Sequence, residues 1–162
     1  MAINIICWNV RGIMSSAYSL SAYLESYDID VALITEHKLF QHSTHFLSCI
    51  NESYAHIQSV DLTIDQYGSA KCGKGGTAIL YKKSLKHCIS AIPDIASNRI
   101  TGIELRGRDI DPVYIFCVYM PSDNNVEVYK EVLSDLQALY SFYNLHGTVV
   151  FAGDFNSHIN EK

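Results

Sequence analysis

The sequence has 162 residues, enough for one domain with its own core, since domains commonly hold about 100–200 residues. Hydrophobic residues make up 48% and charged residues 18% of the chain, which excludes an intrinsically disordered protein. The net charge of −5 gives no general indication of a nucleic-acid binder.

A strand, a helix and a second strand are predicted at the start of the chain. Residues 3–8 form an apolar run typical of a buried strand. Ser15 or Ser16 is expected to cap the following helix, whose apolar positions recur at spacings of three and four. The next apolar run, 31–34, completes a β-α-β unit, in which the crossover is normally right-handed and the strands are parallel.

The middle of the chain is predicted to consist mostly of strands. Residues 38–60 are ambiguous, and the pattern favours a short helix over 43–50 and a strand over 56–60. Residues 65–74 resemble a turn. Because short loops join the strands that follow, we expect consecutive strands to be antiparallel neighbours. These strands are predicted over 77–82, 87–92, 99–105 and 113–119.

A long helix and a last strand complete the predicted elements. Asn124 and Glu127 resemble a capping pair at the start of a helix over 126–143, which has an apolar stripe at helical spacing. The apolar run 148–152 then forms a buried strand, and Gly153 allows a sharp exit from it. This order of elements predicts a mixed sheet with helices on one side.

The cysteines and the apolar runs indicate the cellular compartment. The five cysteines are odd in number and scattered, without a Cys-x-x-Cys pair, so we expect neither a disulfide framework nor a zinc knuckle. The chain starts without a basic leader, and its longest apolar run, 113–120, is far shorter than the roughly 20 residues of a membrane span. A nuclear or cytoplasmic protein is predicted, not a secreted or membrane protein.

Charge is distributed unevenly along the chain. Residues 1–70 hold two basic and seven acidic side chains, whereas residues 71–108 hold eight basic and two acidic ones. A basic segment in an acidic chain is compatible with a phosphate-bearing partner. A solvated hairpin face explains the same segment equally well.

Two motifs in the chain resemble binding sites without meeting their requirements. Residues 68–74 match the start of a phosphate-binding P-loop, but Gly75 stands where Ser or Thr should bind Mg²⁺, and a strand follows in place of a helix. His42 and His45 have a spacing that can hold a metal on a helix, yet no cysteine or carboxylate partner is arranged nearby. Surface histidines are therefore the better interpretation.

Polar side chains follow four apolar runs at the points where these runs end. The carboxyl ends of strands are where α/β proteins gather ligands. Carboxylate, amide and phenol groups make a hard ligand set that suits Mg²⁺ or Mn²⁺ and a substrate phosphate. The turn preference of Asp and Asn explains any one of them alone, but four strand ends together favour a site. The residues are Asn9, Glu36, Tyr119, Asp154 and Asn156.

Five segments resemble the successive motifs of the endonuclease/exonuclease/phosphatase superfamily, in the family's order and over essentially the whole chain. The resemblance implies an α/β fold, a four-layer sandwich with two mixed sheets between helices. The short spacing and the Trp-Asn-Val-Arg-Gly opening are similar to endonuclease domains of LINE-type, non-LTR retrotransposons, which nick DNA ahead of a reverse transcriptase. The segments are 6–12, 33–36, 75–81, 118–121 and 153–156.

The resemblance also implies a cofactor and a role for the two carboxylates. Glu36, helped by Asn9, would hold Mg²⁺ or Mn²⁺. Asp154 would align or activate the attacking water. DNA would be the substrate, and a reverse transcriptase domain in a full-length polyprotein the partner.

Three further residues are implied to bind the substrate phosphate. Asn156 would help to hold it, and Tyr119 would donate a hydrogen bond to one of its oxygens. Arg99 falls where family members often place a basic phosphate contact.

The chain also departs from the family pattern. Family members continue past Gly-Asp-x-Asn with further strands, an orienting Asp and a Ser-Asp-His motif, whereas only six residues follow Asn156 here. His158 is too close in sequence to Asp154 to replace that histidine. We therefore expect residues 1–162 to be the N-terminal portion of one domain, with a fold that is incomplete at the C-terminus and little or no nuclease activity alone.

Other functions remain open at this point. Within the superfamily, a phosphatase or phosphodiesterase for inositol phosphates or sphingolipids also fits, because these substrates carry phosphate too. From another class, a non-catalytic remnant or a phosphate- or nucleic-acid-binding module fits the same residues.

Overall fold

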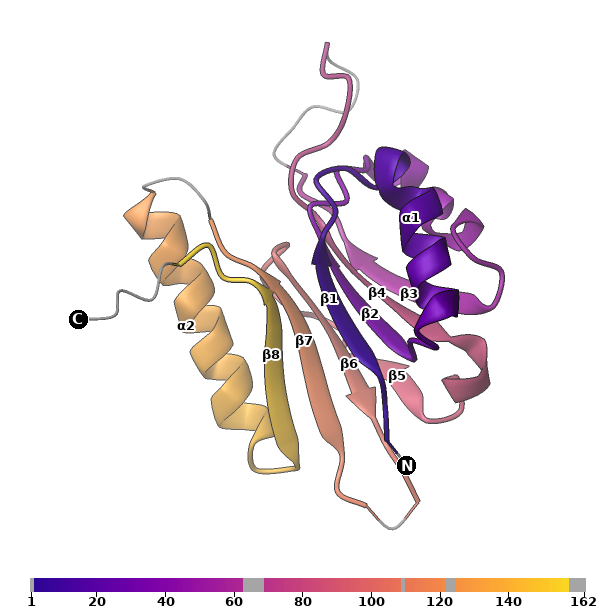
Figure 1. Ribbon diagram of the computed structural model, residues 1–162. Helices are drawn as coiled ribbons and strands as arrows, with labels where there is room; N and C mark the ends of the chain where they lie inside the picture. Colours follow the sequence, from indigo (N-terminus) through magenta and orange to yellow (C-terminus); the bar gives the residue numbers. More distant parts are fainter. Residues whose placement is uncertain (1, 63–68, 109, 122–124, 158–162) are drawn as a thin grey trace, which may run out of the picture.

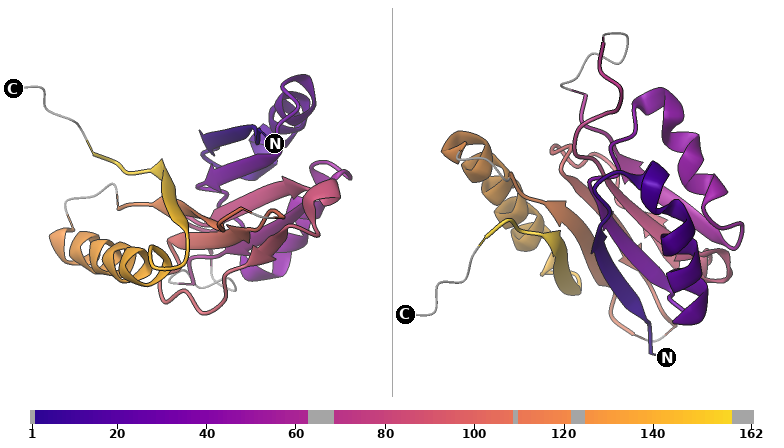
Figure 2. Two further views of the ribbon diagram at one scale, coloured as in Figure 1. Left: turned by 90° about the horizontal axis from the view of Figure 1, so that it is seen from below. Right: turned by 45° about the horizontal axis from the view of Figure 1, so that its top comes forward.

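Two four-stranded sheets form the centre of the computed structural model, which describes residues 2–62, 69–108, 110–121 and 125–157. The sheets face each other, as Figures 1 and 2 show. The first has the strand order β1 (Ile5–Asn9), β2 (Val31–Thr35), β4 (Thr77–Lys82) and β3 (Tyr54–Ser59). The second has the order β5 (Ile89–Ala91), β6 (Ile100–Leu105), β7 (Val113–Tyr119) and β8 (Thr148–Asp154).

Helices cover the outer faces of both sheets. The helix α1 (Ile13–Ser26) packs on the first sheet and α2 (Val126–Tyr143) on the second (Figure 1). Two 3₁₀ helices, η1 (Gln41–Cys49) and η2 (Lys83–Leu85), lie in connections. The resulting layers of helix, sheet, sheet and helix confirm the four-layer sandwich. Within the described ranges, no helix is both long and apolar enough to cross a bilayer.

The single sheet with helices on one side, expected from the order of elements, is wrong. β4 pairs with β2 and β3, whereas β5 pairs with β6, so the chain changes sheets between β4 and β5. The short helix η2 lies in this connection and turns the chain from one sheet to the other. The antiparallel pairing expected of consecutive strands is confirmed for β5 with β6 and for β6 with β7.

Each sheet contains one parallel pair of strands, and these pairs position the site. β1 runs parallel to β2, with Asn9 opposite Thr35, as the β-α-β pattern predicted. β7 runs parallel to β8, with Tyr119 opposite Asp154. β1 and β8 also lie side by side across the two sheets, so all four strand ends meet at the upper end of the molecule in Figure 1.

Three apolar layers hold the sandwich together, because neighbouring residues of a strand point to opposite faces of its sheet. Ile34 is buried under α1. Its neighbour Leu33 packs with Ile115 between the two sheets. Phe116 packs with Leu136 under α2. One apolar layer therefore lies under each helix and one lies between the two sheets.

The start of α1 differs from the prediction. The helix begins at Ile13, and its N-cap position is Gly12, with φ of 111° and no side-chain cap. The hydroxyls of Ser15 and Ser16 donate backward to the carbonyls of Gly12 and Val10. Neither serine therefore caps the helix, because both lie inside its first turn.

The start of α2 and several other ends also shift. The side chain of Asn125 caps α2 by accepting from the Val128 N–H, while Asn124 lies outside the described residues. The expected helix over 43–50 is the 3₁₀ helix η1, and the expected strand over 56–60 is β3, which begins two residues earlier. The strand over 87–92 is reduced to the three residues of β5.

Candidate active site

Asn9, the last residue of β1, links the two predicted acidic residues. Its Nδ2 donates to Glu36 Oε1 at 2.8 Å and to Asp154 Oδ2 at 2.6 Å. Its Oδ1 accepts from the Arg11 N–H at 3.1 Å, which orients the amide with its nitrogen toward the carboxylates. Asn9 is therefore a donor bridge in this structure. Its role as a metal ligand stays a prediction. That role requires the amide to rotate so that Oδ1 faces the cation.

Glu36 follows β2 and accepts hydrogen bonds from three donors. Besides Asn9, these are the Lys38 ammonium, 3.0 Å from Oε2, and the Tyr119 hydroxyl. Burial alone would raise the pKa of Glu36, but the bonds from Asn9 and Lys38, the Lys38 charge and the Tyr119 bond together lower it. Glu36 is thus held as a carboxylate.

Asp154 ends β8 and is fixed by the chain that follows it. Its Oδ1 accepts from the Asn156 N–H at 3.0 Å, and its backbone carbonyl accepts from the Met120 N–H at 2.8 Å. The Asn156 amide in turn donates to the Met120 carbonyl at 2.8 Å. Asn156 therefore braces the ends of β7 and β8, and its contact with a substrate phosphate stays a prediction.

The structure also places Tyr119 and Arg99 at this end of the sandwich. Tyr119 ends β7, and Arg99 directly precedes β6, whose first residue pairs with the penultimate residue of β7. The Arg99 guanidinium carbon lies 5.3 Å from the centre of the Tyr119 ring, within the range of a cation–π contact. A cationic and a phenolic group thus stand beside the carboxylates.

The backbone around the site adopts an uncommon conformation. Arg11, Glu36, Lys38 and Asn156 all have positive φ, at 49°, 56°, 54° and 44°. Residues other than glycine rarely adopt this region, and they persist there only where the surrounding structure imposes it. These four are among six such residues in the described ranges and lie at or beside the strand ends of the site, whereas Asp28 and Asp94 lie elsewhere.

His37 is a buried residue whose part in the site the sequence did not reveal. Its side chain is 1% exposed, its Nδ1 accepts from the Leu39 N–H, and its Nε2 lies 3.0 Å from the Ser59 carbonyl. A backbone N–H can only donate, so Nδ1 is unprotonated and Nε2 carries the proton. Burial lowers the pKa of His37. The neutral ring anchors the backbone between Glu36 and Lys38.

Asp61 is a second residue that the sequence analysis missed. It directly follows Val60 after β3 and is 8% exposed. A Cβ on Gly75 would lie 3.2 Å from the Tyr119 ring and 3.8 Å from Asp61 Oδ2, so the three residues are near neighbours. The position of Asp61 beyond a strand end was the available signal, but the weak pattern of β3 obscured it.

The donor set fits a hard divalent cation with few protein ligands. Two carboxylates converge on one amide, and among the described residues neither a thiolate nor an imidazole shares these hydrogen bonds. Mg²⁺ commonly binds through one or two carboxylates and takes waters or phosphate oxygens for the rest. Within the described ranges, no group of three or more His, Cys, Asp or Glu residues is placed to hold a metal by itself.

The basic segment over 71–108 does not form one surface. β4 and β6 run from the site end to the opposite end of the sandwich, so the segment's charges divide between the two ends. Lys71, Lys74 and Arg99 precede these strands on the site side. The other basic residues lie at the far end of the sandwich, where Lys82 ends β4 and the rest follow the two strands. These are Lys83, Lys86, Arg106 and Arg108.

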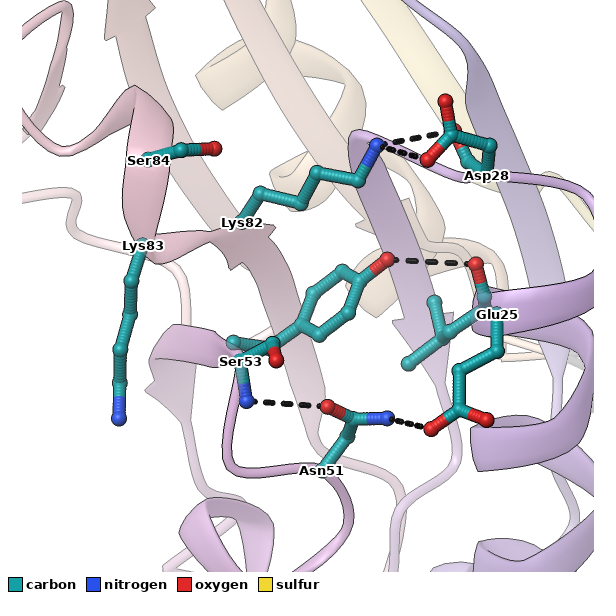
Figure 3. A pocket seen from close by; sticks show the side chains of 9 residues that line it. Glu25, Asp28, Asn51, Ser53, Lys82, Lys83 and Ser84 are labelled. Carbon is teal, nitrogen blue, oxygen red and sulfur yellow. Dashed lines mark hydrogen bonds and ion pairs between the residues drawn. The ribbon is translucent and has the colours of Figure 1, made fainter.

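A pocket of about 550 Å³ lies at that far end (Figure 3). Lys82 pairs there with Asp28 and Asp30 at 2.7 and 2.8 Å, and these bonds raise the pKa of Lys82. Asn51 donates to Glu25 at 2.8 Å. Lys82 and Asn51 are therefore engaged by neighbouring acids, and their contacts join the segments that line the pocket.

Several solved structures share this fold. The chain superposes on the Xenopus laevis APE2 catalytic domain with a TM-score of 0.69 at 18% identity, over 94% of this chain and 58% of that one. Its superposition on D. rerio TDP2 with a single-stranded DNA product has a TM-score of 0.67 at 21% identity, over 96% of this chain and 61% of that one. For the endonuclease domain of TRAS1, a telomere-specific non-LTR retrotransposon, the TM-score is 0.66 at 15% identity, over 97% of this chain and 60% of that one. At these identities the likeness shows the fold.

The family follows from the sequence profile. The chain belongs to the Endonuclease/Exonuclease/phosphatase family, whose profile matches residues 6–161. Membership supports a hydrolase of the nuclease or phosphodiesterase kind. No curated protein sequence matches the chain. The chain spans 58 to 61% of the length of the three solved structures named above.

Proposed function

We propose that this chain contains the metal- and water-binding residues of a Mg²⁺-dependent phosphodiesterase that cleaves DNA. One observation carries the proposal. The carboxylates of Glu36 and Asp154, 118 positions apart in the sequence, accept hydrogen bonds from the same Asn9 nitrogen. Three strand ends from two sheets thus bring two acids together where a phosphodiesterase needs a cation and an activated water.

Each residue has a part in the proposed reaction. Glu36, assisted by Asn9, would hold Mg²⁺ or Mn²⁺, whose charge would help to orient the phosphate and to offset the negative charge that develops on it. Asp154 aligns the attacking water and accepts its proton. Asn156 fixes Asp154 through its N–H. The phosphate oxygens are held by the groups beside the carboxylates, namely Tyr119, Asn156 and Arg99.

The proposal also specifies DNA as the substrate and a retrotransposon as the origin of the chain. Both rest on the Trp-Asn-Val-Arg-Gly opening of the sequence and on structural neighbours described as a DNA-product complex and a non-LTR retrotransposon endonuclease domain. A reverse transcriptase domain is the proposed partner in the whole protein. Five free cysteines agree with a nuclear or cytoplasmic setting.

Turnover by these 162 residues alone is expected to be weak. The side-chain hydrogen bonds of Asp154 go to Asn9 and Asn156, and no imidazole of the described residues joins them. A general acid or base typically contributes about 10²–10⁴-fold to a rate. Rapid Mg²⁺-dependent nicking of supercoiled plasmid that disappears in Asp154→Asn would contradict this expectation.

Metal binding tests the proposal independently of turnover. Calorimetric titration with Mg²⁺ should show one site in the wild-type chain and none in Glu36→Gln. Glu25→Gln, which removes an acid at the far pocket, should retain the site. Loss of binding in both variants, or in neither, would count against the proposed site.

Fluorescence anisotropy tests the substrate class. A labelled DNA duplex should bind more tightly with Mg²⁺ than with EDTA, and this gain should vanish in Glu36→Gln. Mg²⁺-dependent binding of an inositol phosphate in preference to the duplex would instead support the other branch of the superfamily.

A further inference from the structure

Lys38 occupies an unexpected place beside Glu36. Its ammonium lies 3.0 Å from Glu36 Oε2, while the Asn9 amide bonds the other oxygen, Oε1, at 2.8 Å. The Glu36 side chain is 17% exposed and that of Lys38 is 33% exposed, so solvent screens the pair only in part. The protein's own cation thus covers the Glu36 oxygen that Asn9 leaves open.

The backbone presents Lys38 in this position. Glu36 and Lys38 both have left-handed φ, at 56° and 54°, on either side of the anchored ring of His37. The ion pair shows that the side chains of Glu36 and Lys38 lie together, while the imidazole between them in the sequence is buried. Two residues with uncommon backbone conformations on either side of a fixed residue indicate that the surrounding structure imposes this position on Lys38.

A glycine-rich segment, residues 73–76, holds Lys38 from both sides. The Lys38 N–H donates to the Gly75 carbonyl at 2.9 Å, and the Gly73 N–H donates to the Lys38 carbonyl at 2.9 Å. A Cβ at Gly73 would lie 2.7 Å from the Leu39 carbonyl oxygen, so the close approach requires glycine. The backbone of Lys38 is therefore fixed, whereas its four-carbon stem and ammonium can move.

We propose that Lys38 is an internal counter-ion that occupies the cation position at Glu36 and is displaced when a divalent metal binds. The proposal rests on the proposed function, because it assumes that Glu36 is the metal-binding acid. Lys38 neutralises Glu36 in the metal-free protein and lowers its apparent affinity for the metal, since the ammonium must leave Oε2 first. Lys38 is thus a positioning residue that sets the metal concentration at which the site fills.

The direction of one change in affinity tests this role. Lys38→Met removes the charge at similar length, and Mn²⁺ titration followed by the free-ion EPR signal should show binding roughly two- to fivefold tighter than in the wild type, the range of a partly exposed ion pair. Lys38→Arg keeps a cation and should remain close to the wild type. Lys71→Met removes the same charge from the exposed segment before Gly73 and is the matched control.

A residue that only supported the fold would give the opposite sign. Unchanged or weaker Mn²⁺ binding in Lys38→Met, relative to Lys71→Met, would overturn the proposal. If the wild type binds Mn²⁺ and Glu36→Gln does not, the proposed function survives this failure. The two ideas can therefore fail separately.

A measurement on the wild-type chain avoids any folding defect of the variants. Acetylation of lysine amines by an activated ester, read by mass spectrometry, should become faster at Lys38 when Mg²⁺ is added, because the displaced ammonium is no longer held by Glu36. The rate at Lys71 should not change. A Lys38 rate that stays constant or falls as Mg²⁺ saturates the site would overturn the proposal.

Discussion

At the scale of single residues, Asn9 offsets the repulsion between two neighbouring carboxylates when no metal is bound. It donates to both acids at 2.8 and 2.6 Å. Asn9→Leu removes these bonds, and hydrogen bonds to charged groups contribute about 1.5–3 kcal/mol. Urea unfolding in EDTA should show a loss of that order.

Asn9→Asp supplies the matched comparison. A third carboxylate should also destabilise the metal-free protein, because it repels Glu36 and Asp154. Added Mg²⁺ should restore the stability of Asn9→Asp but not that of Asn9→Leu. An Asn9→Leu protein as stable as the wild type in EDTA would show that the two bonds are not important.

His37 gives the fold a dependence on pH. Burial lowers its pKa in the folded state, whereas the unfolded chain takes up the proton near the ordinary value of 6.5. Protonation therefore favours the unfolded state, and the free energy of unfolding falls as the pH drops below 6.5, by at most about 1.4 kcal/mol per pH unit for one group. The part of this fall that His37 causes should be absent in His37→Gln and present in His146→Gln, which alters an exposed histidine. Parallel curves for the wild type and His37→Gln between pH 7.5 and 5 would rule out this source.

Some of the site could be predicted residue by residue, and the limits are physical. Asn9, Glu36, Tyr119 and Asp154 follow apolar strands, and parallel pairing brings such ends together. The orientation of the Asn9 amide was not predictable, because it depends on the Arg11 N–H. The role of Lys38 depends on left-handed backbone that neighbouring segments impose, and no local pattern reveals it.

At the scale of elements, the connection from β3 to β4 supports the end of β2. Gly76 has φ of 84°, and a Cβ there would lie 2.4 Å from His37 ring atoms. Gly12 has φ of 111°, and a Cβ added there would meet no atom within 4 Å. A substitution at Gly12 therefore measures the backbone strain without a steric clash. Gly12→Ala should cost about 1–3 kcal/mol from strain alone, and Gly76→Ala should cost roughly 1–3 kcal/mol more from overpacking. Thermal unfolding measures both, and equal losses would mean that the ring moves aside freely.

The same connection shows why the layers were only partly predictable. Short loops between strands correctly predicted antiparallel neighbours within the second sheet. The change of sheet between β4 and β5 depends on which strands β4 joins, and β4 pairs with strands that precede it in the sequence. The family resemblance predicted two sheets because it includes such long-range pairing, whereas local periodicity does not.

At the scale of the whole molecule, β1 and β8 are edge strands of the two sheets and lie side by side. Ile5, Cys7 and Asn9 alternate with Ile6 and Trp8, which pack toward α1. Ile5 is nevertheless 45% exposed and Cys7 is exposed, and both strands are at the edges of their sheets. An unpaired edge with exposed apolar side chains promotes association.

Self-association is therefore expected for the chain at high concentration. Sedimentation velocity should show species larger than the monomer that decrease in Ile5→Lys. Tyr18→Lys, which changes an 88% exposed residue on α1, should leave them unchanged. A monodisperse wild-type monomer at all concentrations would contradict the expectation.

The most direct test of the central claim is to locate the metal in solution. Substoichiometric Mn²⁺ broadens NMR signals steeply with proximity, and the ¹H–¹⁵N spectrum reports each backbone amide. The amides of Arg11, His37 and Asn156 should broaden first, because they flank the three strand ends, while those of Asp28 and Lys82 at the far pocket stay sharp. Broadening centred on Asp28 and Lys82, or spread evenly over acidic surface residues, would contradict a metal site at Glu36 and Asn9.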